Sequence, residues 1–351
     1  MEVQPHVAIV IVNWNGWQDT VECLESVLRL DYPAYQVIVC DNGSTDGSLE
    51  RIQAWAAGRV PAPATCNKLS SHTMPPVMKP ISCTCLSRSQ AEAGVMTDSR
   101  LVLIDAKANL GFAGGNNLAL RYLRTRGYGS YFWLLNNDTV VEKGALNALI
   151  CRMVADPAIG MCGSTLLYYH RPDIIQGLGG ATYNRWLGTN RHLGVLEPFG
   201  ELPDPGQVEE RMDYVVGASM LVSERFLAEI GLMGEDYFIY FEELDWAMRA
   251  KGHFLMGWAP DSIVYHKEGG SAGTTFDLKR KPSQVDYFLT RNKLIVTRRY
   301  FSMNLPTVYL GLVVTCFNRI WRGQWARLSI IMAAVKDSWQ MSDHPRRYFG
   351  A

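Results

Sequence analysis

The sequence predicts an α/β fold with a mostly parallel sheet, and three observations lead to this prediction. Short, mostly apolar runs recur at Val7–Val12, Tyr35–Cys40 and Tyr131–Leu135, without the regular alternation of a half-exposed strand. Such runs are typical of strands buried on both faces, as in parallel sheets. Helical patterns lie between the runs, and polar clusters follow them. Strands that alternate with helices indicate parallel strands joined by crossover helices.

The first strand, Val7–Val12, is followed by a helix signal. Asp19 and Glu22 have the spacing of a capping box, and the apolar residues after them recur at helical intervals. The second strand ends at Asp41, where a run of turn and capping residues opens another helix that reaches about Ala57. The first 57 residues therefore predict two strand–helix units.

Residues 58–100 interrupt this rhythm. They are rich in Pro, Ser and Thr and show no sustained hydrophobic period. Long loops inside compact domains are uncommon, so we predict a mobile surface insertion rather than a separate domain.

The rhythm resumes with a strand at Leu101–Asp105. A glycine-rich segment, Asn109–Asn117, then leads into a predicted helix at 118–124. Glycines permit close approach of the backbone to a ligand, and the helix N-terminus beyond them can face an anion. Tight packing of the helix on a strand is the alternative explanation.

The second half continues the pattern with less regularity. No elements are predicted for residues 171–211, which are rich in Gly, Pro and aromatic residues. From Gln284 onward the chain is predicted to be helical, with basic and aromatic residues interleaved. The remaining predictions are a strand from Tyr131, a helix at Ala145–Ala155, strands at Gly160–Tyr169 and Tyr214–Val222, a helix capped by Ser223, a helix that Gly252 ends, and a strand at Ser262–His266.

Composition and charge exclude several classes of protein. The 34 Lys and Arg equal the 34 Asp and Glu, but thirteen Lys or Arg face only three Asp from Lys279 to the end, about +10. This distribution argues against nucleic acid as a partner of the whole protein. The eight Cys lack metal or redox spacing, which favours reduced thiols in the cytoplasm. A signal peptide and an apolar run of about 18 residues are both absent from the sequence. We therefore expect a cytoplasmic protein.

Polar side chains directly follow the strand that begins at Tyr131. Asn136, Asn137 and Asp138 stand at its carboxyl end, where open α/β sheets bind their ligands. Amide and carboxylate oxygens suit Mg²⁺ or Mn²⁺ better than they suit metals that prefer thiolates. An ordinary turn is the alternative, because Asn and Asp are common turn residues. Other predicted strand ends carry Asp41, the group Glu242, Glu243 and Asp245, and His266.

Seven stretches of the chain resemble, in order, the motifs of the family 2 glycosyltransferases, which have the GT-A fold. They are IVNWNG, DNGSTDGS, NLGFAGGNN, LLNNDT, VVGASMLV, EDYFIYFEELDWAMRAKG and VYHKEGGS. Together they extend over about residues 7–271, with 58–100 as additional material. The most similar branch is that of the rhamnosyltransferase-like enzymes of bacterial surface-polysaccharide assembly. The resemblance implies inverting transfer of a sugar from a nucleotide diphosphate donor.

The resemblance also implies a divalent metal, Mg²⁺ or Mn²⁺, which neutralises the diphosphate leaving group. Asn136 stands where the DxD motif of the family has its first acid, and this departure removes one negative charge. Asp138 is then the main expected ligand, with His266 as its partner from the far side of the site. Asn136 is a further candidate ligand.

A donor-binding set follows from the same resemblance. Asp41 occupies the position at which a carboxylate accepts the imide N–H of uracil or thymine. Trp14 stands where the family often places an aromatic ring against the base, and core packing is the alternative for it. The other donor-binding candidates are Asn109, Gly111, Gly114 and Asn116, in the loop that borders the ribose and sugar in the family, and Asn137.

The acceptor hydroxyl needs a general base, which in the family is the second residue of an acidic pair. The pair here is Glu242-Glu243, so Glu243 is the first candidate, with a longer side chain than the usual Asp. Like-charge repulsion would raise its pKa, which suits a base. Asp245 is the second candidate, although a surface ion pair with Arg249, four residues further on the helix, is an alternative role for it.

We predict a GT-A domain at 1–275 and a C-terminal helical segment at 276–351. The segment has interleaved aromatic and basic residues, which suit an anionic membrane surface. We therefore expect the protein to be peripheral at the inner face of the cell membrane. Packing on the catalytic domain, or a homo-oligomer, is the alternative.

The predicted donor is dTDP-rhamnose or another dTDP- or UDP-sugar, and the acceptor is a saccharide or a lipid-linked saccharide. One rival is a nucleotidyltransferase, disfavoured because the loop NWNG lacks a basic, glycine-rich phosphate cradle. The other is a degenerate relative that only binds, which the departures at Asn136 and Glu243 favour.

Overall fold

The computed structural model describes residues 4–267 and 283–340, and it confirms the predicted α/β architecture. The strands are β1 (Val7–Asn13), β2 (Tyr35–Asp41), β3 (Cys83–Ser87), β4 (Leu101–Asp105), β5 (Tyr131–Asn136), β6 (Thr139–Val141), β7 (Ile159–Tyr168), β8 (Arg171–Leu178), β9 (Gly180–Asn184), β10 (Thr189–His192), β11 (Tyr214–Val215), β12 (Ser219–Ser223) and β13 (Leu255–His266). The α-helices are α1 (Trp17–Val27), α2 (Ser48–Ala56), α3 (Ser70–Thr73), α4 (Arg88–Glu92), α5 (Gly111–Thr125), α6 (Ala145–Ala155), α7 (Pro205–Glu209), α8 (Glu224–Ile230), α9 (Glu242–Ala250), α10 (Ser283–Tyr300), α11 (Leu305–Trp321) and α12 (Trp325–Gln340). Two 3₁₀ turns, η1 (Glu235–Tyr237) and η2 (Ser302–Asn304), complete the described elements.

The central sheet has the strand order β3-β4-β2-β1-β5-β12-β7-β13-β6 within the described residues, and β8 pairs with β7 beside this path. Strands β4, β2, β1 and β5 run parallel, whereas β12 is antiparallel to its neighbours β5 and β7. In the register of β1, Asn13 faces Asp41 and Val12 faces Asn136. The carboxyl end of β13 pairs with β6, where His266 faces Thr139. The carboxyl ends of these strands therefore bring Asp41, Asn136 and His266 to the same end of the sheet.

Alternate residues of β1 enter opposite cores. Val7, Ile9 and Ile11 pack with residues of α1, α2 and α6 on one face, and Ala8 and Val10 pack with residues of α5 and α8 on the other. All five side chains are fully buried. Burial on both faces is the reason why this strand appears in the sequence as an unbroken apolar run.

Residues 58–100 are not the structureless insertion that their composition predicted. They form α3, β3 and α4, and β3 is an edge strand of the central sheet, parallel to β4. The buried carboxylate of Glu25 on α1 anchors the proline-rich part, because it accepts hydrogen bonds from Val77 N at 2.7 Å and Lys79 Nζ at 2.8 Å. Only Leu86 of β3 is buried, so this strand gives no apolar signal in the sequence.

Helix α5 begins at Gly111, earlier than the predicted residue 118. A Cβ on Gly111 would lie 2.3 Å from the Phe238 carbonyl oxygen, and a Cβ on Gly115 would lie 2.9 Å from a methyl group of Val12. These glycines therefore allow tight packing of α5 on β1 and on residues 235–238. This is the alternative that the sequence left open for the glycine-rich segment.

The second half contains more structure than the sequence indicated. Residues 171–211, for which no element was predicted, form β8, β9, β10 and α7. The predicted strand Tyr214–Val222 is divided between two sheets, with β11 in the small sheet β10-β9-β11 and β12 in the central sheet. Strand β13 begins at Leu255, before the predicted Ser262. The side chain of Ser223 caps α8 as predicted, by accepting a hydrogen bond from Phe226 N.

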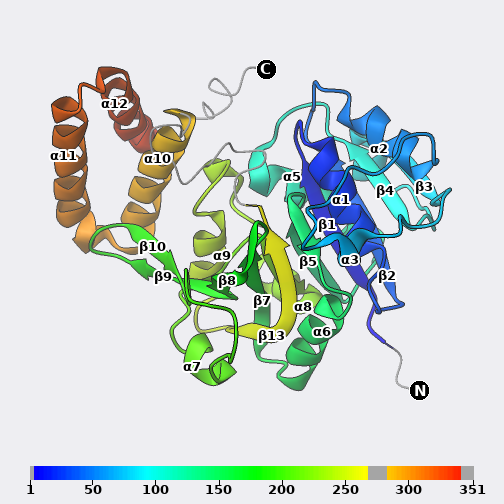
Figure 1. Ribbon diagram of the computed structural model, residues 1–351. Helices are drawn as coiled ribbons and strands as arrows, with labels where there is room; N and C mark the ends of the chain where they lie inside the picture. Colours follow the sequence, from blue (N-terminus) through cyan, green and yellow to red (C-terminus); the bar gives the residue numbers. More distant parts are fainter. Residues whose placement is uncertain (1–3, 268–282, 341–351) are drawn as a thin grey trace.

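Helices α10, α11 and α12 confirm the predicted helical structure after Gln284 for the residues described, up to Gln340. Figure 1 shows α11 and α12 lying away from the central sheet, with α10 between them and the rest of the chain. Among the residues that the structure describes, no helix has both the length and the apolarity that a bilayer crossing requires. The predicted boundary at 275/276 and the end of the stretch VYHKEGGS lie outside the described residues.

Candidate active site

Asn136, Asp138 and His266 lie together at the edge of the sheet. His266 Nε2 is 3.1 Å from Asp138 Oδ1 and 3.3 Å from Asn136 Nδ2. Asp138 is almost fully buried, at 4% exposed. The turn from β5 to β6 and the end of β13 bring these residues together, although they are far apart in the sequence.

A hydrogen bond orients the imidazole of His266. Its Nδ1 lies 2.8 Å from Oε1 of the buried Gln176 on β8, and because an amide oxygen can only accept, Nδ1–H donates and Nε2 faces Asp138. One imidazole nitrogen with carboxylate and amide oxygens is a donor set that suits Mn²⁺ or Mg²⁺. The residues present therefore fit a divalent ion. Within the described chain no group of three or more His, Cys, Asp and Glu forms a metal cluster, so any ion would depend on Asn136 or on its substrate for further ligands.

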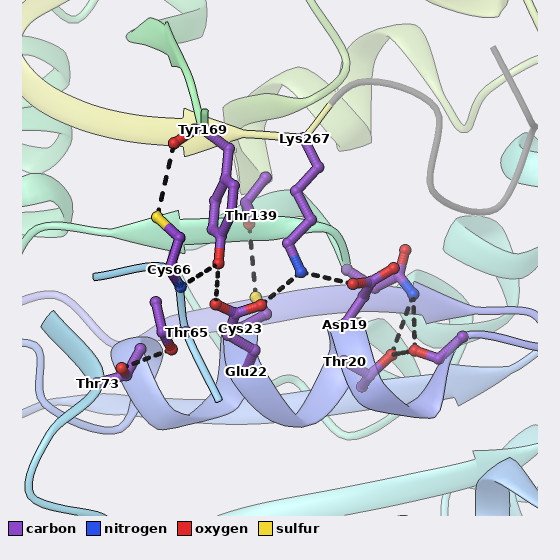
Figure 2. Close-up of polar contacts among 12 residues, drawn as sticks. Asp19, Thr20, Glu22, Cys23, Thr65, Cys66, Thr73, Thr139, Tyr169 and Lys267 are labelled. Atoms are coloured by element: carbon purple, nitrogen blue, oxygen red, sulfur yellow. Dashed lines mark hydrogen bonds and ion pairs between the residues drawn. The ribbon is translucent and has the colours of Figure 1, made fainter. Parts of the chain in front are cut away.

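Lys267, directly after His266, fixes the end of β13 to α1 (Figure 2). Its Nζ lies 2.6 Å from Asp19 Oδ1 and also pairs with Glu22 Oε2, while Tyr169 OH donates to the other oxygen of Glu22. The predicted capping box is therefore wrong. Helix α1 begins at Trp17 without a side-chain cap, and the two acidic residues bind Lys267 instead.

The loops after β1 and β2 are joined around Asp41. Its buried carboxylate accepts hydrogen bonds from Asn13 Nδ2 at 2.6 Å, from Ser44 Oγ at 2.7 Å and from Ser44 N at 3.0 Å. Asn15 N donates to Ser44 Oγ at 2.9 Å. Trp14 lies in the same loop and is partly exposed, so its ring is not part of the buried core. Contacts inside the protein thus already hold the carboxylate of Asp41.

Internal hydrogen bonds also hold most of the other donor-binding candidates. Asn109 Oδ1 accepts from Asn42 Nδ2 at 3.1 Å, and Asn116 Nδ2 donates to the Phe112 carbonyl at 3.0 Å. Asn137 Nδ2 donates to Thr20 Oγ1 at 3.1 Å. Gly111 and Gly114 lie in the first turn of α5, where a Cβ on Gly114 would be 2.7 Å from Leu110 Cβ. In this arrangement these residues shape the edge of the site.

Glu243 lies in the first turn of α9 and lines a cavity of about 120 Å³. The other lining residues are Asn190, His192, Tyr214, Val216, Tyr240, Phe241, Leu244 and Leu289. Gly217 packs against Glu243 so closely that a Cβ there would be 2.3 Å from Glu243 Oε1. The next residue, Ala218, accepts a hydrogen bond from Asn136 N at 3.0 Å. The cavity therefore adjoins the group of Asn136, Asp138 and His266.

The pKa of both carboxyl groups of the acidic pair is raised. Burial is the main cause at Glu242, where the charge of Glu243 adds to it, and burial is also the main cause at Glu243. The pKa of Glu243 is raised in the predicted direction, but the cause is burial and not the like-charge repulsion that we expected. Glu242 is 1% exposed, and its Oε2 has no hydrogen-bond partner within the described structure.

Asp245 has a different environment from Glu243. It is 1% exposed and accepts hydrogen bonds from Arg249 Nε, Arg299 Nη1, Tyr300 OH and Tyr237 OH, at 2.7–3.0 Å. Burial alone would raise its pKa, but the hydrogen bonds from Tyr300 and Arg299 and the charge of Arg249 hold the pKa below its ordinary value. The spacing of Asp245 and Arg249 suggested a surface ion pair, but the carboxylate of Asp245 is buried. Its oxygens are already used by hydrogen bonds that hold neighbouring elements together.

Sequence reasoning missed Gln176, Lys267 and Asn42. Gln176 lies in a segment without predicted elements, and Lys267 resembles any surface lysine. Asn42 follows Asp41 in a turn-like run, yet it is buried and donates to the Gly111 carbonyl at 3.0 Å. A single sequence carries no signal for these pairings, because each partner comes from a distant element.

Residues 8–62 match the model of the family described as Glycosyl transferase family 2. This part of the chain is therefore similar to the family 2 glycosyltransferases. The matched residues extend from β1 to beyond α2 and include Trp14 and Asp41. The match supports the predicted enzyme class, a glycosyltransferase.

The low-salt glycan biosynthesis hexosyltransferase Agl10 of Haloferax volcanii is 27% identical to the chain over 210 residues. The alignment covers 58% of this chain and 62% of Agl10, so it spans less than two thirds of that relative. GalNAc-T7, solved with UDP, GalNAc and Mn²⁺, superimposes with a TM-score of 0.52 at 14% identity, over 84% of this chain and 51% of that one. The mannosyltransferase PcManGT from Pyrobaculum calidifontis, solved with GDP-Man and Mn²⁺, superimposes with a TM-score of 0.49 at 14% identity. This superposition covers 99% of this chain and 79% of PcManGT. The likeness to GalNAc-T7 supports the GT-A fold.

Proposed function

We propose that this domain transfers a sugar, with inversion, from a nucleotide diphosphate donor to a saccharide acceptor. One observation carries the proposal. Gly217 and Ala218 are consecutive, and they connect the cavity of Glu243 with the group of Asn136, Asp138 and His266. A base and a site for the leaving diphosphate are thus adjacent, as displacement in one step requires.

Asp138 and His266 would hold a divalent cation, and Asn136 would complete the protein ligands. When bound, the ion supplies Lewis-acid neutralisation of the diphosphate. Gln176 keeps Nε2 of His266 directed toward the site by accepting a hydrogen bond from Nδ1–H. The loops that carry Trp14 and Asp41 would receive the nucleobase. Their mutual hydrogen bonds give that surface a fixed shape before the donor arrives.

Glu243 would take the proton of the acceptor hydroxyl. Its raised pKa makes the carboxylate a stronger base, and the cavity beside it offers polar side chains, Asn190 and His192, to an acceptor sugar. Asp245 is the weaker candidate for the base, because four donors already use its oxygens and its pKa is lowered.

The donor that best fits the resemblance is dTDP-rhamnose, and the acceptor is a lipid-linked saccharide. The experiment is to incubate the protein with a panel of dTDP-, UDP- and GDP-sugars and Mn²⁺ and to measure release of the nucleoside diphosphate. Preferred hydrolysis of dTDP-rhamnose supports this donor. Preferred hydrolysis of another nucleotide sugar overturns dTDP-rhamnose as the proposed donor but still supports a glycosyltransferase. Binding of nucleotide sugars without hydrolysis favours a relative that only binds.

An anionic lipid surface is the partner that we propose for α11. Apolar residues with large exposed fractions recur at helical spacing on this helix, among them Val313, Phe317 and Trp321, which is 82% exposed. The exposed Trp325, Arg322 and Lys336 lie nearby in sequence, and the chain after Lys279 has an excess of about ten positive charges. Aromatic rings beside basic groups suit the interface of an anionic bilayer.

A further inference from the structure

The segment that leads into the acidic pair has a strained backbone. Phe238, Tyr240 and Phe241 have φ angles of 68°, 68° and 75°, in the left-handed region that bulky residues rarely adopt. Glu242 and Glu243 follow directly as the first residues of α9. The position of both carboxylates therefore depends on whatever keeps residues 237–241 in this conformation.

Asn292 of α10 makes the main side-chain hydrogen bonds to this segment. Its side chain is 0% exposed, and its Nδ2 donates to the carbonyls of Tyr237, Ile239 and Tyr240 at 2.9, 2.8 and 3.0 Å. Arg291, also buried, donates from Nη1 to Asn292 Oδ1 at 2.8 Å and to the Asp236 carbonyl at 2.8 Å. The two N–H groups of one amide are thus shared among three backbone carbonyls, of which that of Tyr237 also accepts from Ile239 N at 2.9 Å.

Other contacts hold the same segment from two sides. On the α10 side, Phe238 stacks on Phe288 with ring centroids 5.3 Å apart. On the opposite side, at the start of α5, Phe112 N donates a hydrogen bond to the Phe238 carbonyl at 2.7 Å, and the absence of a side chain at Gly111 leaves room for this contact. The segment therefore lies between the start of α5 and α10, and only Asn292 binds several of its carbonyls at once among the described side chains.

We infer that Asn292 is a positioning residue for Glu243, an inference that rests on the proposed function. It does not touch substrate; it acts through residues 237–241 and sets where the base stands relative to the acceptor. Helix α10 is accordingly part of the catalytic unit, although the sequence placed it in a separate C-terminal segment.

The test compares Asn292→Asp, which keeps the size but lacks the N–H donors, and Asn292→Ser, which keeps one donor, with wild type. Thr297→Val is the matched control, because Thr297 is also fully buried on α10 and its hydroxyl donates within the helix, to the Lys293 carbonyl. Deuterium exchange of peptides that cover 235–241 reports the segment directly. Release of nucleoside diphosphate from the preferred donor gives kcat, and titration with UDP and Mn²⁺ gives nucleotide affinity.

We expect faster exchange in 235–241 and a fall in kcat of at least about tenfold in Asn292→Asp, with nucleotide affinity within about twofold of wild type. Asn292→Ser should lie between Asn292→Asp and wild type, and Thr297→Val should resemble wild type. Unchanged exchange, unchanged kcat, or an equal loss in Thr297→Val overturns the inference. If Asn292→Asp does not fold, Asn292→Ser decides by the same criteria. If wild type releases no diphosphate from any sugar, the proposed function fails, and the catalytic role of Asn292 fails with it, while exchange still shows whether Asn292 holds the segment.

Discussion

Single side chains in this protein have roles that depend on their burial. Glu242, Glu243 and Asp245 stand within four residues of one another, yet the pKa of the first two is raised and the pKa of the third is lowered. The difference follows from neighbours, because Asp245 receives cationic and hydroxyl donors whereas Oε2 of Glu242 receives none within the described residues. Cationic and hydroxyl donors thus favour the charged carboxylate of Asp245, whereas at Glu242 and Glu243 burial outweighs the backbone hydrogen bonds and favours the neutral acid.

Glu243→Gln should lower kcat by about 10²–10⁴-fold, the usual loss for a general base. The amide keeps the size of the side chain and cannot accept the proton, so the affinity for the donor should remain nearly unchanged. Single-turnover rates with the preferred nucleotide sugar and saccharide acceptor measure this effect. Glu229→Gln, an exposed carboxylate on α8, is the control. A Glu243→Gln protein with wild-type turnover would exclude Glu243 as the base.

Glu242→Gln should stabilise the protein at neutral pH but not in acid. The folded-state pKa of Glu242 lies above its ordinary value of 4.5, so the folded state binds the proton more tightly than the unfolded state. This contribution to stability is complete below pH 4.5 and is lost as pH rises through the folded-state pKa. Thermal melts at pH 4.5 and pH 8 should show similar Tm values at the lower pH and a gain on the order of 2–4 °C at the higher one. A gain that is equal at both pH values would contradict this account.

Asp138→Ala and His266→Ala should each weaken binding of Mn²⁺ by about tenfold or more, while the fold remains intact. Either change removes one ligand from a set that already has Asn136 in place of an acid. Titration with Mn²⁺ in the presence of UDP, followed by electron paramagnetic resonance, measures free ion directly. Circular dichroism controls for folding. Unchanged Mn²⁺ affinity in either variant would remove that residue from the proposed ligands.

At the residue scale, the sequence predicted which side chains meet but not what holds them. The grouping of Asn136, Asp138 and His266 followed from strand ends and family motifs. The hydrogen bonds of Gln176 and Asn292 could not be predicted, because they join elements whose relative position depends on the whole fold.

At the scale of elements, predictions succeeded where a segment carries its own signal. Leu101–Asp105 and Ala145–Ala155 have the predicted bounds, since each has a clear apolar period. Strand β3 failed because its five residues are mostly polar and partly exposed. The start of α5 failed because glycines argue against a helix, yet here close neighbours require them.

Replacing residues 63–97 with a short Gly-Ser linker should destabilise the protein, which reverses the expectation from composition. The change removes β3 and two of the donors to the buried carboxylate of Glu25, Val77 N and Lys79 Nζ, so that the carboxylate keeps Trp55 Nε1 but loses part of its hydrogen bonding. Urea denaturation should show a lower midpoint or loss of soluble protein. The smaller change Glu25→Ala should cost about 1–3 kcal/mol, because Val77 N and Trp55 Nε1 lose their acceptor. Met78→Ser, at a residue 92% exposed, should have no effect. An unchanged midpoint after the replacement would show that the segment adds nothing to the core.

At the scale of the whole molecule, α11 is the prominent unassigned surface. Protein should bind vesicles that contain phosphatidylglycerol and leave them as NaCl rises from about 0.1 to 1 M, because the screening length falls from about 10 to 3 Å. Phe317→Ser with Trp321→Ser should abolish binding, and Met303→Ser, outside α11, should not. Binding that resists salt would indicate insertion of the apolar face. An association of copies that these substitutions disrupt, without vesicle binding, would indicate a homo-oligomer instead.

The hydrogen bonds from Asn292 to residues 237–241 also affect the order in which parts of the protein can fold during synthesis. Strands β2 and β5, which carry Asp41 and Asn136, and the turn that carries Asp138 leave the ribosome long before Asn292, so the nucleotide side of the sheet can form while α10 is still missing. Because the chain is made from its N-terminus, the strained segment lacks the hydrogen bonds of Asn292 until the chain has passed residue 292. A nascent chain that ends before α10 should therefore bind a nucleotide, but Glu243, the proposed general base, should not yet be held in position.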